Sequence, residues 1–458
     1  MKNLLIRAGM SPLDTFDPSF MILNNSIGGN VGNLVYQFSV FRTLMTEGTT
    51  ITPDYYEIDP KKAEEINEKY DCYIIPLADA FRKDFVPSLR KYTKLIQKLT
   101  IPVVVIGVGL RAPFEPQLDE GFSFDDDVRA FVSAVLEKST TIGVRGEITA
   151  KYLSRLGFRE GIDHTVIGCP SMYTFGRDLT IRETKITKDS MVTVNSSLLS
   201  PNNVLDFISR GMEEFPNHYF ILQWLKEMRL TYAGAPGISN KSIENYPIKM
   251  SDDAYMNNKV RFFLNVPTWI DFLKQADLSF GARLHGNITA TIAGTPSLII
   301  PKDARMRELA EYHGLTQVWH SEISEKTSLS ELIERSDFHS PERKQSINFD
   351  HFISFLNTNN LDHIYKKDTN PSVIPLDDQL TEVQLKQPLM PVSACSIEEM
   401  ADRWENYYPL LEKSYEEKIK DYKGKLVEKD KKIKRQQAIL NRKAVRIALK
   451  TANMFRIK

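Results

Sequence analysis

The 458-residue chain has few cysteines and no long apolar run, and both absences narrow its class. Cys72, Cys169 and Cys395 lie far apart with no paired spacing, which argues against a disulfide framework or a zinc knuckle. No stretch approaches the roughly 18 consecutive apolar residues of a membrane span. The first residues, MKNLLIRAGM, lack the apolar core of a signal peptide, so we expect a cytoplasmic protein.

Several familiar catalytic signatures are also missing. The chain contains no H-E-x-x-H zinc motif, no G-x-S-x-G nucleophile turn and no paired C-x-x-C. Three consecutive acids, residues 125–127, begin a predicted helix, where capping and the helix dipole explain them without a metal. We therefore expect neither a metal site nor a bound cofactor.

Charge is balanced over the whole chain but not along it. Lysine and arginine total 59, and so do aspartate and glutamate. Residues 423–458 hold 13 of the basic residues and two of the acidic ones, a surplus of 11 that leaves about −11 on the rest. An acidic body argues against nucleic acid as a partner. A basic end suits an anionic lipid surface or an acidic protein.

Short apolar runs bounded by turn residues alternate with helical patterns up to residue 338, which predicts parallel α/β units. We expect strands at 20–24, 72–77, 102–108, 141–144, 165–168, 191–194, 219–223, 277–280 and 297–300, and helices at 125–138, 147–156, 203–215, 267–275 and 287–293. The polar segment 177–189 separates two such sets. We therefore predict an N-terminal domain over 1–180 and a C-terminal, donor-binding domain over 181–338.

Beyond residue 338 the pattern changes. Residues 339–395 are predicted to form an irregular crossing segment, since much of it is rich in Asn, Asp and Pro. Residues 396–458 are predicted to form a helical basic tail, with apolar residues every seven positions from Ile419 to Met454. Most companion positions are Lys or Gln. Self-association through 410–458, binding to an anionic membrane and a solvated helix thus stay open as alternatives.

The most informative segment is 279–303, SFGARLHGNITATIAGTPSLIIPKD. Its predicted strand is followed by Arg283 and His285, which are two residues apart and would leave an extended backbone on the same side. A helix of small residues begins directly behind them, and its free N–H groups favour an anion. Gly286 and Asn287 belong to this helix start, where Asn287 can equally act as a cap.

A glycine-rich loop, NNSIGGNVGN, follows the strand predicted at 20–24. Its residues Gly29, Asn30 and Gly32 would let backbone approach a ligand closely. The loop lacks the G-x-G-x-x-G spacing of dinucleotide sites and the lysine of a P-loop, so a plain turn between elements is the alternative.

Two more segments lie at predicted strand ends. IGVRGEITAKYLSRLGF, residues 142–158, places Arg145 between a strand and a helix, either as a cleft residue or as an ion-pair partner of Glu147. VIGCPSMY, residues 166–173, contains Cys169, which we interpret as a buried thiol and not as a nucleophile.

Together these motifs resemble the polysaccharide pyruvyltransferase family, over roughly residues 24–315. The Arg-x-His-Gly at 283–286 matches the family signature, and the other three segments match its glycine-rich loop, its Val-Arg element and its proline turn. Two positions depart from the family, since Gly146 and Cys169 stand where it usually has Asp. The resemblance implies two doubly wound, Rossmann-like domains facing a cleft, as in the glycosyltransferase-B arrangement; the basic helical extension is added at the C-terminus.

The resemblance also implies an activity, namely transfer of pyruvate from phosphoenolpyruvate to a sugar of a capsule, exopolysaccharide or precursor as a cyclic ketal. Arg283 and His285 are then expected to be catalytic. His285 would either hold the phosphate or protonate the methylene carbon. The residues expected to bind substrate are Arg145, Asn30, Gly29, Gly32, Gly286 and Asn287.

The implied partners are phosphoenolpyruvate and a saccharide acceptor, free or lipid-linked, which would place the protein in the cytoplasm or on the inner face of the cell membrane. The residues leave two alternatives open. One is a glycosyltransferase of the same double fold that uses a nucleotide sugar, because fold alone does not choose the donor. The other is a non-catalytic scaffold in polysaccharide assembly.

Overall fold

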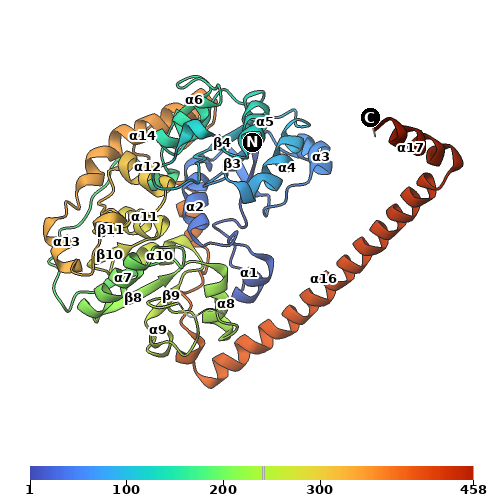
Figure 1. The fold of residues 1–458 in the computed structure, drawn as a ribbon. Helices are drawn as coiled ribbons and strands as arrows, with labels where there is room; N and C mark the ends of the chain where they lie inside the picture. The colour runs from blue at the N-terminus through green and yellow to red at the C-terminus, as the bar shows by residue number, and fades with distance from the viewer. Residues whose placement is uncertain (240, 242, 457–458) are drawn as a thin grey trace. The chain divides into compact units, whose positions relative to one another are not determined.

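The computed structural model describes residues 1–239, 241 and 243–456, and the chain divides after Ser396 into two compact units. The first unit contains two parallel β-sheets with helices packed around them, and the second is helical (Figure 1). The predicted α/β class with two doubly wound domains and a helical extension is confirmed.

The first sheet has the order β2-β1-β3-β4, and every pair in it is parallel. A second pair, β5-β6, continues it through a bridge between Val108 and Val144. Strands β3 and β4 are buried along their whole length because helices cover both faces of a parallel sheet. The strands are β1 Lys2–Ile6, β2 Thr49–Pro53, β3 Cys72–Pro76, β4 Val103–Ile106, β5 Ile142–Val144 and β6 His164–Val166.

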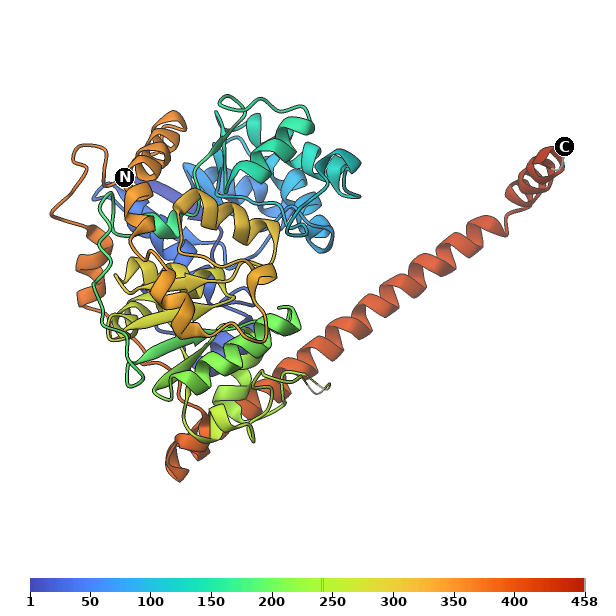
Figure 2. The same cartoon turned by 60° about the vertical axis from the view of Figure 1, so that its left-hand side comes forward.

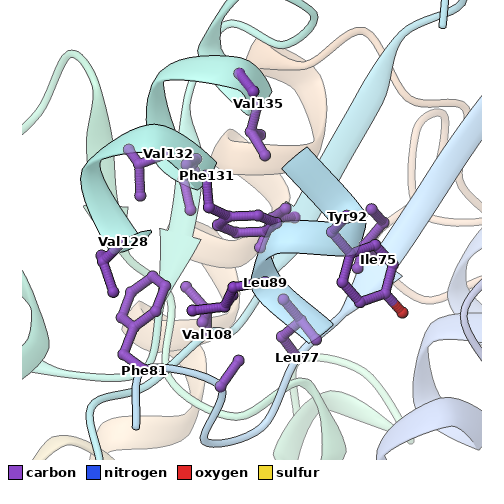
Figure 3. Close-up of a cluster of buried hydrophobic side chains, with 14 of the residues drawn as sticks. Ile75, Leu77, Phe81, Leu89, Tyr92, Val108, Val128, Phe131, Val132 and Val135 are labelled. Atoms are coloured by element: carbon purple, nitrogen blue, oxygen red, sulfur yellow. The ribbon is translucent and has the colours of Figure 1, made fainter. Parts of the chain in front are cut away.

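Helices α4 and α5 pack on one face of this sheet (Figure 3). The apolar residues of α5 follow the spacing i, i+3, i+4, i+7, which directs Val128, Phe131, Val132 and Val135 to one side. The ring of Phe131 meets that of Tyr92 edge-on, 6.3 Å between centroids. The helices of this domain are α1 Pro18–Asn24, α2 Gly32–Leu44, α3 Ala63–Lys69, α4 Val86–Ile96, α5 Asp125–Leu136 and α6 Glu147–Arg155.

The second sheet has the order β11-β10-β7-β8-β9, again parallel throughout. Its strands are β7 Val192–Asn195, β8 His218–Leu222, β9 Val260–Phe262, β10 Leu278–Gly281 and β11 Ser297–Ile299. Its helices are α7 Asn202–Glu214, α8 Leu225–Ala233, α9 Asp253–Met256, α10 Val266–Leu273, α11 Leu284–Ile292, α12 Ala304–His313 and α13 Leu329–Arg335.

Helix α12 follows the last strand of the second sheet and packs against α6 of the first domain. Its Glu308 accepts hydrogen bonds from the backbone N–H and the hydroxyl of Thr149 in α6, at 2.9 and 2.8 Å. Arg305, in the first turn of α12, pairs with Asp79 beyond β3 at 3.1 Å. These contacts hold the carboxyl ends of the two sheets in one structure.

Three sequence predictions of elements are wrong. The segment 20–24 is helical, as part of α1, because Pro18 starts a helix there and the apolar run is too short to separate a strand from a helix. Helix α11 begins at Leu284 and not at 287, so only Arg283 has the extended backbone that we expected also for His285. Strands β1, β2 and β9 were not predicted.

The segment 339–395 is not irregular throughout. It contains α14 Ser340–Thr358 and α15 Pro375–Thr381. The buried residues of α14 include Phe349, Phe352 and Phe355, whose helical spacing was available in the sequence.

The second unit consists of α16 Ile397–Leu440 and α17 Lys443–Arg456. Figure 2 shows α16 as one continuous helix followed by the shorter α17. The apolar seam of α16 is exposed, with Ile419 at 53% and Leu426 at 61%. In the part of the chain that the structure describes, no helix is both long enough and apolar enough to span a membrane.

Candidate active site

A cavity of about 890 Å³ lies in the first unit, where the strands of the two sheets end. Its wall includes residues that follow β1, β3 and β4 of the first sheet and β7, β8, β10 and β11 of the second. Open parallel sheets bind ligands at this edge, because the connections that leave the strand ends diverge there.

The wall of this cavity is cationic. Seven lysine and arginine side chains line it against three aspartates. Such a surplus in a concave site concentrates the field and favours an anionic ligand. The basic residues are Arg7, Arg82, Lys83, Arg111, Arg283, Lys302 and Arg305, and the acids are Asp79, Asp84 and Asp303.

Arg283 stands directly before α11 and is only 7% exposed. Its Nε donates to the carbonyl of Ser196 at 2.5 Å, and its guanidinium lies over the Trp224 ring, 4.2 Å from the centroid. Its Nη2 is 3.7 Å from Glu227 Oε1. Contacts on three sides fix the guanidinium against the cavity wall. A flexible arginine on the surface would lack such contacts.

His285 lies in the first turn of α11 and also lines the cavity. Its Nε2 is 3.9 Å from Cys169 Sγ, and its ring is 6.4 Å from that of Tyr36. Burial, followed by the charges of Arg145 and Arg305, holds the pKa of His285 well below its usual range. The imidazole is therefore neutral at neutral pH and offers one N–H as a hydrogen-bond donor.

The glycine-rich loop connects α1 to α2 and crosses to the second sheet. The Gly29 carbonyl accepts from Leu225 N at 3.0 Å, and Val31 N donates to the Gln223 carbonyl at 2.8 Å. Gly29 and Asn30 line the cavity. Gly32 instead packs on His285, where a Cβ would lie 2.8 Å from the histidine Cβ. The loop thus requires glycine for close packing and sets the position of the imidazole.

Arg145 is fully buried and does not line the cavity. Its Nε donates to the Gly107 carbonyl at 2.8 Å, and its guanidinium lies 5.0 Å from the centroid of the Tyr36 ring. Nη1 and Nη2 have no hydrogen-bond partner among the described residues. The alternative of an ion pair with Glu147 is not formed, and Arg145 acts on His285 through its charge.

Asn287 and Gly286 do not line the cavity. The Asn287 amide donates to the carbonyls of Arg283 and Gly281, at 2.9 and 3.1 Å, and to Asn195 Oδ1 at 3.1 Å. At Gly286 a Cβ would lie 2.6 Å from Gln223 Nε2. Both residues hold the start of α11 against the ends of the strands, so the geometry favours the structural alternative for Asn287.

Cys169 is buried, as interpreted from the sequence. Its backbone N–H donates to His313 Nε2 at 2.8 Å, and its Sγ is 3.5 Å from Ser171 Oγ.

The described residues contain no group of three or more His, Cys, Asp or Glu that could hold a metal ion. Asp125, from the acidic cluster, pairs with Arg155.

Sequence reasoning missed Lys302, which follows β11 in the wall of the cavity. Its Nζ is 3.4 Å from Ser200 Oγ. Burial, and next the charge of Arg283, lower the pKa of Lys302 to about 7. A lysine at a strand end within the segment 279–303 was the available signal.

The fold and the cavity define a two-domain α/β protein with a cationic cleft at the carboxyl ends of its strands. A model of the polysaccharide pyruvyl transferase family matches residues 30–303, more than half of the chain. The chain belongs to this family, whose members are transferases, and the family name implies a saccharide acceptor.

Solved structures similar to this chain include UDP-GlcNAc 2-epimerases. The enzyme of Methanocaldococcus jannaschii, in complex with UDP-GlcNAc and UDP, is 14% identical over 78% of this chain and 99% of its own, with a TM-score of 0.43. That of Neisseria meningitidis, bound to UDP-GlcNAc, is 11% identical over 78% and 100%, with a TM-score of 0.40. No curated protein matches the chain.

Proposed function

We propose that the protein transfers the pyruvyl group of phosphoenolpyruvate to a sugar of a surface polysaccharide or its precursor and closes it as a cyclic ketal. One observation carries the proposal. Arg283 is clamped in a cationic cavity at the start of α11, beside a neutral His285. This arrangement suits a small, highly charged donor, because phosphoenolpyruvate combines a phosphate and a carboxylate.

In this scheme the phosphate lies at the N-terminus of α11. The helix dipole and its first N–H groups favour an anion there. Arg283 supplies a charged fork, and the His285 N–H supplies a neutral donor. Gly29 and Asn30, across the cavity, contact the donor or the sugar. Hydrogen-bond donors that are already in place thus stabilise the negative charge that develops on the departing phosphate.

A nucleotide-sugar glycosyltransferase is the competing function, and ligand binding separates the two. We expect saturating phosphoenolpyruvate to raise the thermal unfolding temperature of the full-length protein, since a ligand that binds the folded state stabilises it by mass action. UDP, UDP-glucose and UDP-GlcNAc at equal concentrations should leave it unchanged. Stabilisation by a UDP compound, with none by phosphoenolpyruvate, would contradict the proposal.

The scaffold alternative predicts a different result in cells. A scaffold retains its role when Arg283 is replaced, whereas a transferase loses pyruvylated polysaccharide while the protein level stays the same. Measuring the pyruvate content of the polysaccharide in a strain that carries Arg283→Lys decides between them.

The basic tail gives the proposed enzyme a location. We infer that residues 410–458 attach the protein to the inner face of the cell membrane, where a lipid-linked acceptor would be presented. Residues 423–458 carry 13 basic and two acidic residues. Exposed apolar residues, such as Leu426 and Ile447, alternate with them on α16 and α17. Anionic headgroups contribute about 1 kcal/mol for each lysine or arginine near the surface.

Charge removal in the full chain tests this location. We expect a variant with five basic residues replaced by glutamine to lose sedimentation with phosphatidylglycerol vesicles at 0.1 M salt. The control exchanges five exposed lysines of the first unit. Equal sedimentation of both proteins would contradict membrane attachment, and a change in mass on light scattering would instead indicate self-association. The five positions in the tail are Lys429, Lys431, Lys432, Lys434 and Arg435.

A further inference from the structure

Lys302 lies one strand away from the proposed phosphate site. Strand β11, which precedes it, pairs with β10, which precedes Arg283. Neighbouring strands are about 4.8 Å apart, and only three bonds separate the phosphorus of phosphoenolpyruvate from its methylene carbon, so the donor is small enough to lie between the two strand ends. Both side chains line the same cavity. A ligand whose phosphate is held at Arg283 can therefore present its methylene carbon to Lys302.

The ammonium of Lys302 shares the cavity with several arginines. Among the described residues no carboxylate lies within 4 Å of its Nζ, and Ser200 Oγ is its neighbour at 3.4 Å. The charges that act on it are those of Arg283, Arg305 and Arg111, against the single negative charge of Asp303. Asp303 is itself engaged, since it accepts from Met306 N at 2.9 Å and pairs with Arg305 at 3.3 Å.

This environment makes Lys302 an unusually strong acid for a lysine. Burial and the neighbouring arginines lower its pKa to about 7. An acid catalyst is most effective when its pKa lies near the working pH, because a large fraction of it is then protonated and it still transfers its proton readily. An ordinary lysine, with a pKa near 10.4, would hold its proton too tightly.

His285 is less suited to the same task. Its ring is half-buried, and desolvation together with the charges of Arg145 and Arg305 disfavours the imidazolium. The charged form that would donate a proton to carbon is scarce at neutral pH. The neutral ring can still donate a hydrogen bond to phosphate.

We propose that Lys302 is the acid that protonates the methylene carbon of phosphoenolpyruvate, while His285 serves as a ligand of the phosphate. The assignment rests on the proposed function. From the sequence, His285 could either hold the phosphate or protonate the methylene carbon. The proposal assigns the protonation to Lys302 and leaves the phosphate to His285.

The protons and electrons balance through Lys302. The π pair of the C2–C3 double bond takes a proton from the Lys302 ammonium, and an acceptor hydroxyl oxygen forms a bond to C2. The hydroxyl proton passes to the amine so formed, which restores the ammonium. The bond from C2 to the phosphate oxygen then breaks, and its electron pair leaves with phosphate. The second hydroxyl oxygen bonds to C2, and its proton ends on the released phosphate.

Two substitutions separate proton donation from charge. Lys302→Arg keeps a cation that does not give up its proton, so we expect kcat to fall by about 10²- to 10⁴-fold with KM for phosphoenolpyruvate within threefold. Lys302→Met should lower kcat as much and also raise KM. The assay follows phosphate release from phosphoenolpyruvate, with a panel of methyl glycosides as acceptor probes. Lys151→Arg, on the exposed surface of α6, is the matched control.

The pH profile gives an independent readout. The reactive form of Lys302 is the ammonium, which predominates below its pKa and is lost above it. For the wild type kcat/KM should therefore fall tenfold per pH unit above about pH 7. Lys302→Cys treated with 2-bromoethylamine restores an amine that is more acidic than lysine, and this limb should then move to lower pH.

The outcomes distinguish the two proposals. Wild-type protein that neither binds phosphoenolpyruvate nor releases phosphate overturns the proposed function. Active wild type with Lys302→Arg within fivefold in kcat, or with an unchanged pH limb in the rescued variant, overturns only the assignment of Lys302. Thermal stabilisation of Lys302→Arg by phosphoenolpyruvate shows that this variant is folded and binds its donor.

Discussion

Replacing Arg283 with lysine is expected to lower kcat/KM for phosphoenolpyruvate by about 10²- to 10³-fold, although the charge is kept. Lysine has no fork that could donate to Ser196 and to a phosphate at once, and it does not stack on Trp224 as guanidinium does. The loss should appear mainly in kcat, because charge on the phosphate grows as the bond to C2 breaks. The rate of phosphate release gives kcat, and its dependence on the phosphoenolpyruvate concentration gives KM for both proteins.

Arg335→Lys, the same change on the exposed end of α13, serves as the control and should leave both constants unchanged. A circular dichroism spectrum and an unfolding temperature equal to those of the wild type exclude a folding defect in Arg283→Lys. A loss of less than tenfold in kcat/KM would argue that Arg283 holds the loop at Ser196 and plays no part in the reaction.

Replacing Arg145 with methionine should stabilise the protein and impair its activity. The guanidinium is fully buried, and two of its nitrogens lack partners among the described residues. Removing two buried donor groups that lack hydrogen-bond partners should raise the free energy of unfolding by about 1–3 kcal/mol. The same change removes a positive charge near His285 and should lower kcat/KM by on the order of 10²-fold, similar to the loss of one electrostatic donor.

Arg42 provides the matched contrast. It is also buried, but its guanidinium pairs with Asp377 at 2.7 Å and bonds the carbonyl of Thr174 at 2.5 Å. Arg42→Met should therefore destabilise the protein while active-site chemistry in the folded fraction stays the same. Denaturant midpoints and kcat/KM of both variants test the pair. If Arg145→Met destabilises the protein and leaves kcat/KM unchanged, Arg145 is a structural residue.

Most strands of the two sheets, but fewer than half of the helices around them, could be predicted, and those that could have a strong local pattern. The helix at Asp125–Leu136, for example, carries three acids in its first turn and one continuous apolar face. Other elements could not be predicted in the same way. The apolar run at 20–24 is compatible with a strand or a helix by its pattern alone, and in the structure it continues the helix that begins at Pro18.

Within the site, the segment 279–303 could be recognised from its residue types. Arg283 and His285 both line the cavity, as expected for an anion site at the start of a helix. Arg145 and Asn287 are the opposite case. Each occupies a suitable place in the sequence, yet Arg145 is enclosed behind the wall and the Asn287 amide is bonded to backbone. Which way a side chain leaves a strand end depends on neighbours that are distant in sequence.

By itself the sequence determined the parallel α/β class and the basic helical end, and it indicated residues 279–303 as a candidate anion site, since periodicity, local charge and strand-to-helix motifs are encoded over a few consecutive residues. Only the tertiary structure decided that Lys302 stands among Arg283, Arg305 and Arg111 and that His285 is kept neutral. The physical reason is that desolvation and the fields of charges from separate strands arise only when the two sheets are brought together.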